Sequence, residues 1–416
     1  MTRAASQRSF EALRHPGFRV YFIASSLAMM ADSIEHVISY WILFQKFQSP
    51  ALGGFAIISH WLPFLLFSVW SGALADRFDP RRIIQLGMAL FMGVSLAWGM
   101  LFTFDALEMW HAMVLLILHG LAGVLWGPAT QLLVHDIVGP EQLHSAIRLN
   151  ATSRYLGLLA GPAVGSAVML ALGPANGIIV NALIYLPLVL WLWKAPYGPK
   201  FRKDEPPPVR AVRGFEDIFS TARAIVGNRT VVTMTLLGGC AALFVGNGYH
   251  PQMPEFAFDL GHGDAGLTYG LLLGADACGA LVAGLLLESR GLLQARAKTA
   301  LMLAMLWCCG LAAFSASTSY ALSLLLLFLV GFVELSFFAM AQTLVQLRAP
   351  PEIRGRVIGL YNMSALGMRT FSGVTIGVVG GFIGIHWSLA LSAMALLVVI
   401  GILFAYLQRA EAAAVI

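Results

Sequence analysis

Long runs of apolar residues without any charged side chain constrain this chain most strongly. Residues 83–104 contain no charge, and residues 155–193 contain none over two helix lengths. The centre of the second run, residues 173–177, reads GPANG and predicts a turn. A helix needs about 20 apolar residues to cross the hydrocarbon core of a bilayer. These runs therefore predict membrane-spanning helices, some of them joined in pairs by tight turns.

The composition agrees with a protein that lies almost entirely in a membrane. Of the 416 residues, 58% are hydrophobic and 11% are charged, whereas soluble chains carry about 25% charged residues. We therefore expect an all-α polytopic membrane protein. We expect twelve spans, at residues 18–45, 51–75, 83–104, 110–134, 146–170, 174–193, 230–250, 264–288, 298–316, 320–346, 355–381 and 385–407.

The basic residues predict the orientation of these spans. If the amino terminus is cytoplasmic, nearly all Lys and Arg outside the spans fall in cytoplasmic segments, and the opposite side receives Lys46 alone. This imbalance is the one that the positive-inside rule requires. The net charge of +5 therefore indicates topology rather than nucleic-acid binding. We expect the protein to lie in a bacterial inner membrane with both termini on the cytoplasmic side. The lipid bilayer is therefore an expected partner.

Internal similarity predicts two related halves. GALAD at residues 72–76 aligns with GLLLE at residues 284–288. TQLLV at residues 130–134 aligns with AQTLV at residues 341–345, at nearly the same offset. A polar segment with a triple proline separates the halves. We predict a first six-helix bundle at residues 1–194, a cytoplasmic linker at 195–229 and a second six-helix bundle at 230–416. Such pseudo-symmetric repeats are typical of transporters.

The segment GALADRFDPRR at residues 72–82, in the loop after the second predicted span, resembles the signature loop of the major facilitator superfamily. The resemblance extends over the whole chain and implies the fold of that superfamily. It implies that this loop latches one conformational state rather than binding substrate. The residues expected in this role are Gly72, Asp76, Arg77, Arg81 and Arg82. A loop whose basic residues only set topology is the alternative, and all three arginines are expected at the cytoplasmic surface.

A glycine-proline motif in the fifth predicted span narrows the resemblance. Gly161, Pro162 and Gly165 resemble the motif of proton-coupled exporters, with Ser166 in place of a final glycine. Together with the segment at residues 150–154, this is most similar to the branch that contains siderophore exporters, such as those for enterobactin, and drug exporters. Ordinary packing glycines are the alternative interpretation of the motif.

The sequence MMADSIEHVISYW, residues 29–41, places acids inside the first predicted span. Asp32, Glu35, His36 and Ser39 lie at helical positions i, i+3, i+4 and i+7, so they share one face. A charge at membrane depth costs about 2.5–3.5 kcal/mol. This face should therefore meet a water-filled cavity or partners from other helices. We expect Asp32 or Glu35 to carry a proton, with His36 tuning it; a purely structural pair is the alternative.

Other ionisable residues within predicted spans are candidates for the same site. Arg154 is a candidate counter-ion or anion contact in the first half, and Asp276, Glu334 and Arg369 are candidates in the second half, with Glu334 and Arg369 as the preferred pair. His60 and His119 are expected to be packing or interfacial residues.

No sequence motif indicates an enzyme or direct use of ATP, because a Walker-type phosphate loop and hydrolase signatures are absent. We predict a secondary active transporter, a proton antiporter that exports a small amphipathic organic molecule by alternating access. A siderophore or a lipophilic drug is the expected substrate. We expect no cofactor, no resident metal ion, no nucleic-acid partner and a monomer. Alternatives are an importer of a ferric chelate or metabolite, a divalent metal carrier that uses the first-span residues with His60, and a receptor without transport activity.

Overall fold

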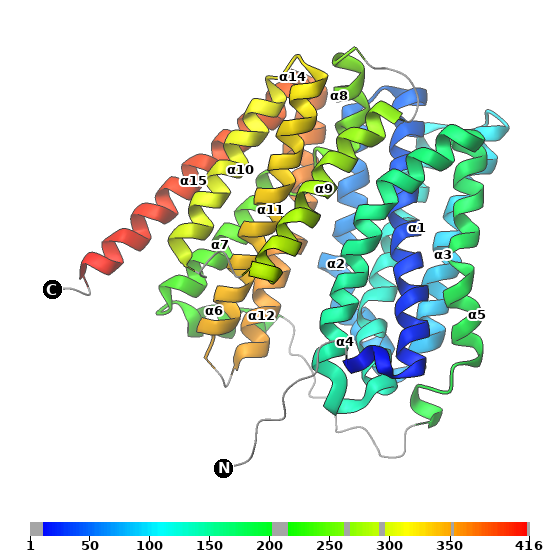
Figure 1. The fold of residues 1–416 in the computed structure, drawn as a ribbon, viewed down its shortest axis with the longest axis horizontal. Coiled ribbons are helices and arrows are strands. Elements are labelled where there is room, and N and C mark those ends of the chain that lie inside the picture. The colour runs from blue at the N-terminus through cyan, green and yellow to red at the C-terminus, as the bar shows by residue number, and fades with distance from the viewer. Residues whose placement is uncertain (1–10, 202–214, 262–266, 291–295, 351–352, 414–416) are drawn as a thin grey trace. The chain divides into compact units, whose positions relative to one another are not determined.

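The computed structural model describes residues 11–201, 215–261, 267–290, 296–350 and 353–413 (Figure 1). These residues are almost entirely helical. The main elements are α1 (Pro16–Phe47), α2 (Pro50–Arg77), α3 (Pro80–Thr103), α4 (Met109–Ile184), α5 (Leu186–Lys194), α6 (Phe215–Ile225), α7 (Arg229–Phe244), α8 (Met253–Asp259), α9 (Leu267–Arg290), α10 (Ala297–Ser315), α11 (Tyr320–Arg348), α12 (Arg354–Asn362), α13 (Arg369–Ser372), α14 (Val379–Ile383) and α15 (Ile385–Ala413).

Helix lengths agree with the predicted membrane protein. Among the described residues, eight stretches are long and apolar enough to cross a membrane, and α7 and most of α9 are shorter apolar helices. One of the eight stretches, residues 160–201, contains the last part of the fifth predicted span and all of the sixth. Together with α1, these elements account for the twelve spans of the predicted all-α fold.

Two glycines divide α4 into separate helical segments. Gly139 has φ +69° and Gly173 has φ +76°, and both leave the helical conformation. Glycine reaches positive φ without the steric cost that other residues meet. The fourth, fifth and sixth predicted spans therefore follow one another with little connecting chain, as the sequence predicted for the turn at residue 173. The backbone stays helical through Pro162.

Contacts divide the chain into two compact units. The first comprises Met1–Ser39 and Leu66–Ala211, and the second comprises Tyr40–Leu65 and Val212–Ile416. The predicted first bundle, residues 1–194, included residues 40–65, whereas the structure groups these residues with the second unit. The described part of the predicted linker also contains a helix, α6, which packs against α12.

Close backbone contacts explain why residues 40–65 belong to the second unit. The Cβ that a larger residue would add at Gly54 would lie against the carbonyl oxygen of Gly373 and 2.8 Å from the Cα of Gly377. The side-chain amide of Gln252 also donates to the carbonyl of Pro50 at 3.0 Å. Glycines allow two membrane helices to approach this closely.

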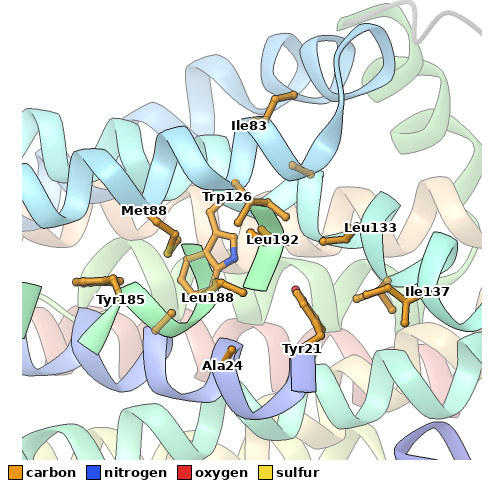
Figure 2. Packing of buried hydrophobic residues seen from close by; sticks show 14 of the residues in the cluster. Tyr21, Ala24, Ile83, Met88, Trp126, Leu133, Ile137, Tyr185, Leu188 and Leu192 are labelled. Carbon is orange, nitrogen blue, oxygen red and sulfur yellow. The ribbon is translucent and has the colours of Figure 1, made fainter. Parts of the chain in front are cut away.

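The first unit has a continuous apolar core (Figure 2). Trp126 on α4 lies among Tyr21 of α1, Met88 of α3, and Leu188 and Leu192 of α5. Large rings and branched side chains from four elements fill the space between the helices, so this core fixes their relative positions. The same helices carry the polar side chains described below.

Arg81 of the predicted latch loop is buried within the protein, and its position at the cytoplasmic surface stays a prediction. Asp79 caps α3 and accepts from Arg81 Nε at 3.0 Å and Nη2 at 2.6 Å. Arg81 Nη1 donates to the carbonyl of Ala195 at 2.5 Å. Arg82 is exposed and lies over the Trp193 ring. Arg81 thus ties the start of α3 to the end of α5. The latch role stays a prediction, and the surroundings of Gly72, Asp76 and Arg77 lie outside the described residues.

The Asp79–Arg81 pair predicts a stability difference that depends on pH. Partial burial raises the pKa of Asp79, but hydrogen bonds and charge from Arg81 outweigh it and hold the pKa below its ordinary value. A depressed folded pKa stabilises the fold above the unfolded value of about 3.9, and this contribution is lost as the pH falls through the folded value.

We therefore expect Asp79→Asn to lower the free energy of unfolding by about 1 kcal/mol at neutral pH, the scale of a partly exposed pair. The difference from wild type should shrink below about pH 4. Thermal unfolding of the detergent-purified protein across pH measures this, with the exposed Asp105→Asn as the matched control. A difference that grows on acidification would contradict the pairing.

Candidate functional site

The acidic face of α1 points into the first unit. The side chain of Asp32 is 13% exposed and that of Glu35 is 2% exposed. The sequence allowed either a water-filled cavity or partners from other helices around this face. In the structure, the face meets partners from other helices. Burial of two carboxyl groups at membrane depth requires compensation by hydrogen bonds or opposite charge.

His119 of α4 provides that compensation by bridging the two acids. Its Nδ1 lies 2.7 Å from Glu35 Oε1, and its Nε2 lies 3.1 Å from Asp32 Oδ1. The first contact is a hydrogen bond, whereas the second is at ion-pair distance without hydrogen-bond alignment. The Phe91 ring meets the imidazole edge to face at 4.8 Å, which restricts the ring to the space between the carboxyl groups.

Hydrogen-bond chemistry fixes the minimum number of protons in this group. A neutral imidazole has one N–H donor and one acceptor nitrogen, and an ionised carboxylate only accepts. With both ring nitrogens facing carboxylate oxygens, a neutral ring would set one lone pair against another. Asp32, Glu35 and His119 are therefore compatible when they share one further proton, on the ring or on a carboxyl group.

Glu35 is held more firmly than Asp32. The Ser95 hydroxyl of α3 donates to Glu35 Oε2 through a short hydrogen bond. Asn181 of α4 donates to the carbonyl of Ala31 at 3.0 Å and lies 3.4 Å from the Ser95 hydroxyl. Both Glu35 oxygens thus have fixed partners, whereas Asp32 keeps the greater solvent exposure.

His36 occupies the partly exposed edge of the group. Its Nδ1 lies 2.9 Å from the carbonyl of Asp32, which can only accept, so Nδ1 carries the hydrogen. Its ring meets that of His119 edge to face at 4.8 Å. The side chain of His36 is 24% exposed, so it contacts both Asp32 and the solvent.

His119 contacts both acids, so the expectation that it is a packing or interfacial residue was wrong. His111 lies at one end of the predicted span 110–134 and His119 lies farther inside it, and the cost argument that selected Asp32 applies equally to a histidine at that depth. His60 contacts the Trp61 and Phe64 rings in the second unit. The surroundings of the Arg154 side chain lie outside the described residues.

The predicted acids of the second unit also meet. The Tyr249 hydroxyl lies 3.4 Å from Asp276 Oδ1 and 3.3 Å from Glu334 Oε2. Arg369 lies on α13, donates to the carbonyl of Ala365 at 3.3 Å and stacks over the Trp61 ring at 5.2 Å. The direct pair of Glu334 with Arg369 stays a prediction.

The glycine-proline segment of α4 packs on the acidic helix. A Cβ at Gly157 would lie 2.6 Å from Met29 Cβ, one at Gly161 would collide with Ser33, and one at Gly165 would lie 3.3 Å from Val37 Cβ. Glycines at intervals of four line one helix face. This face lets α4 approach α1 on both sides of the turn that carries Asp32 and Glu35, so it fixes the position of the acids.

A helical membrane fold with carboxyl groups buried within its spans is typical of a membrane transporter. Residues 7–416 match the family described as transmembrane secretion effector. The chain therefore belongs to this family of the major facilitator superfamily.

Other known proteins resemble the chain more distantly. The staphyloferrin A transporter of Staphylococcus aureus (strain NCTC 8325 / PS 47) is 20% identical over 173 residues, which is 41% of this chain. The match spans 44% of that relative's length.

Solved structures share the fold. A bacterial homologue of the human lysosomal transporter Spinster, inward-facing and unoccupied, superposes with TM-score 0.71 at 14% identity and covers 96% of this chain and 98% of its own. A nucleoside transporter superposes with TM-score 0.69 at 14% identity, and the match covers 94% of this chain and 98% of that protein. A D-xylose–proton symporter superposes with TM-score 0.62 at 17% identity, and the match covers 92% of this chain and 95% of that protein.

Removal of His119 should expose the repulsion between the two acids. We expect His119→Ala to destabilise the protein by about 3 kcal/mol, because it leaves two buried carboxyl groups without their partner. Glu35→Gln added to His119→Ala should restore part of that loss. A double-mutant cycle by thermal unfolding measures the coupling, with His135→Ala, 53% exposed on the same helix, as control. Strict additivity would contradict the bridge.

The glycine face predicts a steric effect. We expect Gly161→Val to lower stability by about 1–3 kcal/mol, as overpacking does, because the added side chain meets Ser33. Gly401→Val is the matched control, since nothing lies within 4 Å of its Cβ position. Equal unfolding temperatures for the two variants would show that α4 does not depend on this close approach.

Proposed function

We propose that the protein is a proton antiporter that exports a small amphipathic organic molecule, a siderophore or a lipophilic drug, by alternating access. The observation that carries this proposal is the buried Asp32–His119–Glu35 group, which is compatible with its own hydrogen bonds when it holds a shared proton. Such a group binds and releases protons at membrane depth, where ionisable residues are retained for function.

Asp32 is the carboxyl group that we assign to proton exchange. It keeps 13% of its side chain exposed, against 2% for Glu35, and its contact with His119 is the longer and less aligned of the two. Loss of the shared proton leaves Asp32 and Glu35 repelling each other across the ring. This repulsion changes the relative free energy of the two conformational states, which is the requirement for a proton to drive a conformational change.

Antiport follows if proton and substrate compete for the same site. A substrate that binds near the ionised Asp32 group favours release of the proton, and reprotonation favours release of the substrate. One charge that moves down 100 mV supplies about 2.3 kcal/mol. That energy supports a substrate gradient of about fifty-fold.

The comparisons support the direction and the substrate class. The family description refers to secretion, and the Gly161–Pro162 motif is similar to that of proton-coupled exporters. The staphyloferrin A transporter is a siderophore transporter among the relatives. Import of a ferric chelate is the alternative, and transport in vesicles of known orientation separates the two directions. We further propose a monomer in the bacterial inner membrane with both termini cytoplasmic.

A divalent metal ion is the second candidate substrate. The first unit brings together two carboxyl groups and the imidazoles of His36 and His119. Mixed nitrogen and oxygen ligands suit transition-metal ions. A metal-dependent rise in unfolding temperature that is lost in both His36→Ala and His119→Ala would favour this candidate over an organic substrate.

The assignment of Asp32 predicts different phenotypes for two isosteric variants. We expect Asp32→Asn to reduce pH-driven transport by about tenfold or more, because the variant has lost the exchanging charge. We expect Glu35→Gln to keep pH-driven transport and to change mainly substrate affinity or pH dependence.

Proteoliposomes with an imposed pH gradient measure both effects. The probes are a ferric hydroxamate, a ferric catecholate and a lipophilic fluorescent dye, with a trapped pH indicator that reports proton flux. Asp105→Asn serves as the control. Near-wild-type transport of a probe by both site variants would overturn the assignment of the proton to this group.

A further inference from the structure

The second unit contains a chain of polar side chains that the proposed function does not use. Arg369 Nη1 donates to Asn247 Oδ1 through a short hydrogen bond. Asn247 Nδ2 lies 3.3 Å from His250 Nδ1, and His250 Nε2 lies 3.4 Å from Asp276 Oδ2. The Tyr249 hydroxyl then connects Asp276 to Glu334, which completes a continuous series from a cation to two acids.

The cation at one end fixes the protonation of the histidine. Arginine only donates, so the oxygen of the Asn247 amide must face it and the NH₂ group must face His250. An NH₂ group donates, so His250 Nδ1 must be the acceptor nitrogen. The ring hydrogen is therefore on Nε2, which faces Asp276 at ion-pair distance without hydrogen-bond alignment. An imidazolium would set an N–H against the amide NH₂, so His250 is held neutral.

A proton bound in this cluster must then lie on the carboxyl side. Tyr249 has one hydroxyl hydrogen but lies 3.3–3.5 Å from oxygens of both acids. It can donate to one carboxylate, while the other contact is favourable only if that carboxyl group donates to the phenol oxygen. Two ionised carboxyl groups around a single phenol would repel each other without a proton between them.

We propose that Asp276 and Glu334 form a second proton-binding site, with Tyr249 as the shared hydrogen-bonding group and Asn247 and His250 as positioning residues. Proton uptake forms one O–H bond on a carboxylate oxygen, and the Tyr249 hydroxyl turns to donate to the other carboxylate. Release breaks that O–H bond and returns the proton to water. No other covalent bond changes.

Among the described residues, ionisable groups from several elements surround this pair. Tyr249 and His250 follow α7, Asp276 is on α9, Glu334 is on α11 and Arg369 is on α13. Asp276 repels the ionised form of Glu334, whereas the charge of Arg369 opposes that repulsion. Arg369 also contacts Asn247 and the aromatic faces of Trp61 and Phe338.

The local backbone explains how Arg369 reaches this position. It lies between two π-helical segments, η5 (Met363–Gly367) and η6 (Gly373–Val378). A π-helical turn rotates the side chains that follow it relative to a regular helix, and such turns are frequent at functional sites. The second of these segments, η6, also contains Gly373 and Gly377, which contact Gly54 closely.

This inference deepens the proposed function, because a second proton site in a separate unit implies that two protons serve each transport cycle. Proton binding itself can be tested without substrate. Infrared difference spectra of the purified full-length protein, recorded between acidic and alkaline pH in H₂O and D₂O, detect the carbonyl stretch of protonated carboxyl groups. The variants are Glu334→Gln, Asp276→Asn and Tyr249→Phe, with the half-buried acid variant Glu255→Gln as control.

We expect one titrating, deuterium-sensitive carboxyl band to be lost in both Glu334→Gln and Asp276→Asn, because either change removes the repulsion that retains the proton. Tyr249→Phe should keep a band but shift its frequency, which a merely structural tyrosine would not do. Glu255→Gln and Asp32→Asn should keep the band. Spectra of Glu334→Gln and Asp276→Asn that match wild type would overturn the second site. Transport results with Asp32→Asn would stand independently, so the two proposals can fail separately.

Discussion

The cost of an unpaired charge inside a membrane governs how this protein is built. Asp32 and Glu35 are tolerated because His119 lies between them and Ser95 completes the coordination of Glu35. This pairing requires α1, α3 and α4 to meet at one depth, and the apolar core around Trp126 together with the glycine face at Gly161 holds them there. Packing and charge compensation therefore depend on each other. A core that allowed α4 to move away from α1 would leave two carboxyl groups in hydrocarbon, at a cost comparable to the stability of a typical domain.

The two units meet the same constraint with different chemistry. In the first unit an imidazole separates two carboxyl groups, and in the second unit a phenol does so. An imidazole can accept a full proton, whereas a phenol only redistributes its hydrogen bond. The first group can therefore hold its proton on the central ring, while the proposed second site would hold it on an acid. The neutral His250, fixed through Asn247 by Arg369, maintains that difference.

Much of the fold was predictable from sequence because membrane insertion imposes a simple rule. The charge-free runs at residues 83–104 and 155–193 predicted spans, and the turn at Gly173 was correctly placed by its glycine and proline. The helical spacing predicted that Asp32 and Glu35 share one face of α1, and this face contacts Ser95 of α3 and His119 of α4. The residues that contact these acids were harder to predict, because His119 is 84 residues from Glu35 in the chain and Tyr249 is 85 residues from Glu334. Spacing along one helix carries no information about side chains that arrive from another. The partner of Arg81 could not be predicted for the same reason, since its acceptor, the carbonyl of Ala195, lies 114 residues away.

The number of proton sites sets the concentration gradient that such a protein can maintain. One proton moved down 100 mV supports about a fifty-fold gradient, and two protons support about 2,500-fold, because the free energies add. Export of a molecule that must not accumulate inside the cell favours the larger ratio. Two sites that share no side chain can also bind their protons in separate steps. The placement of one carboxyl pair in each unit is therefore consistent with a cycle in which each unit contributes its own proton to the conformational change.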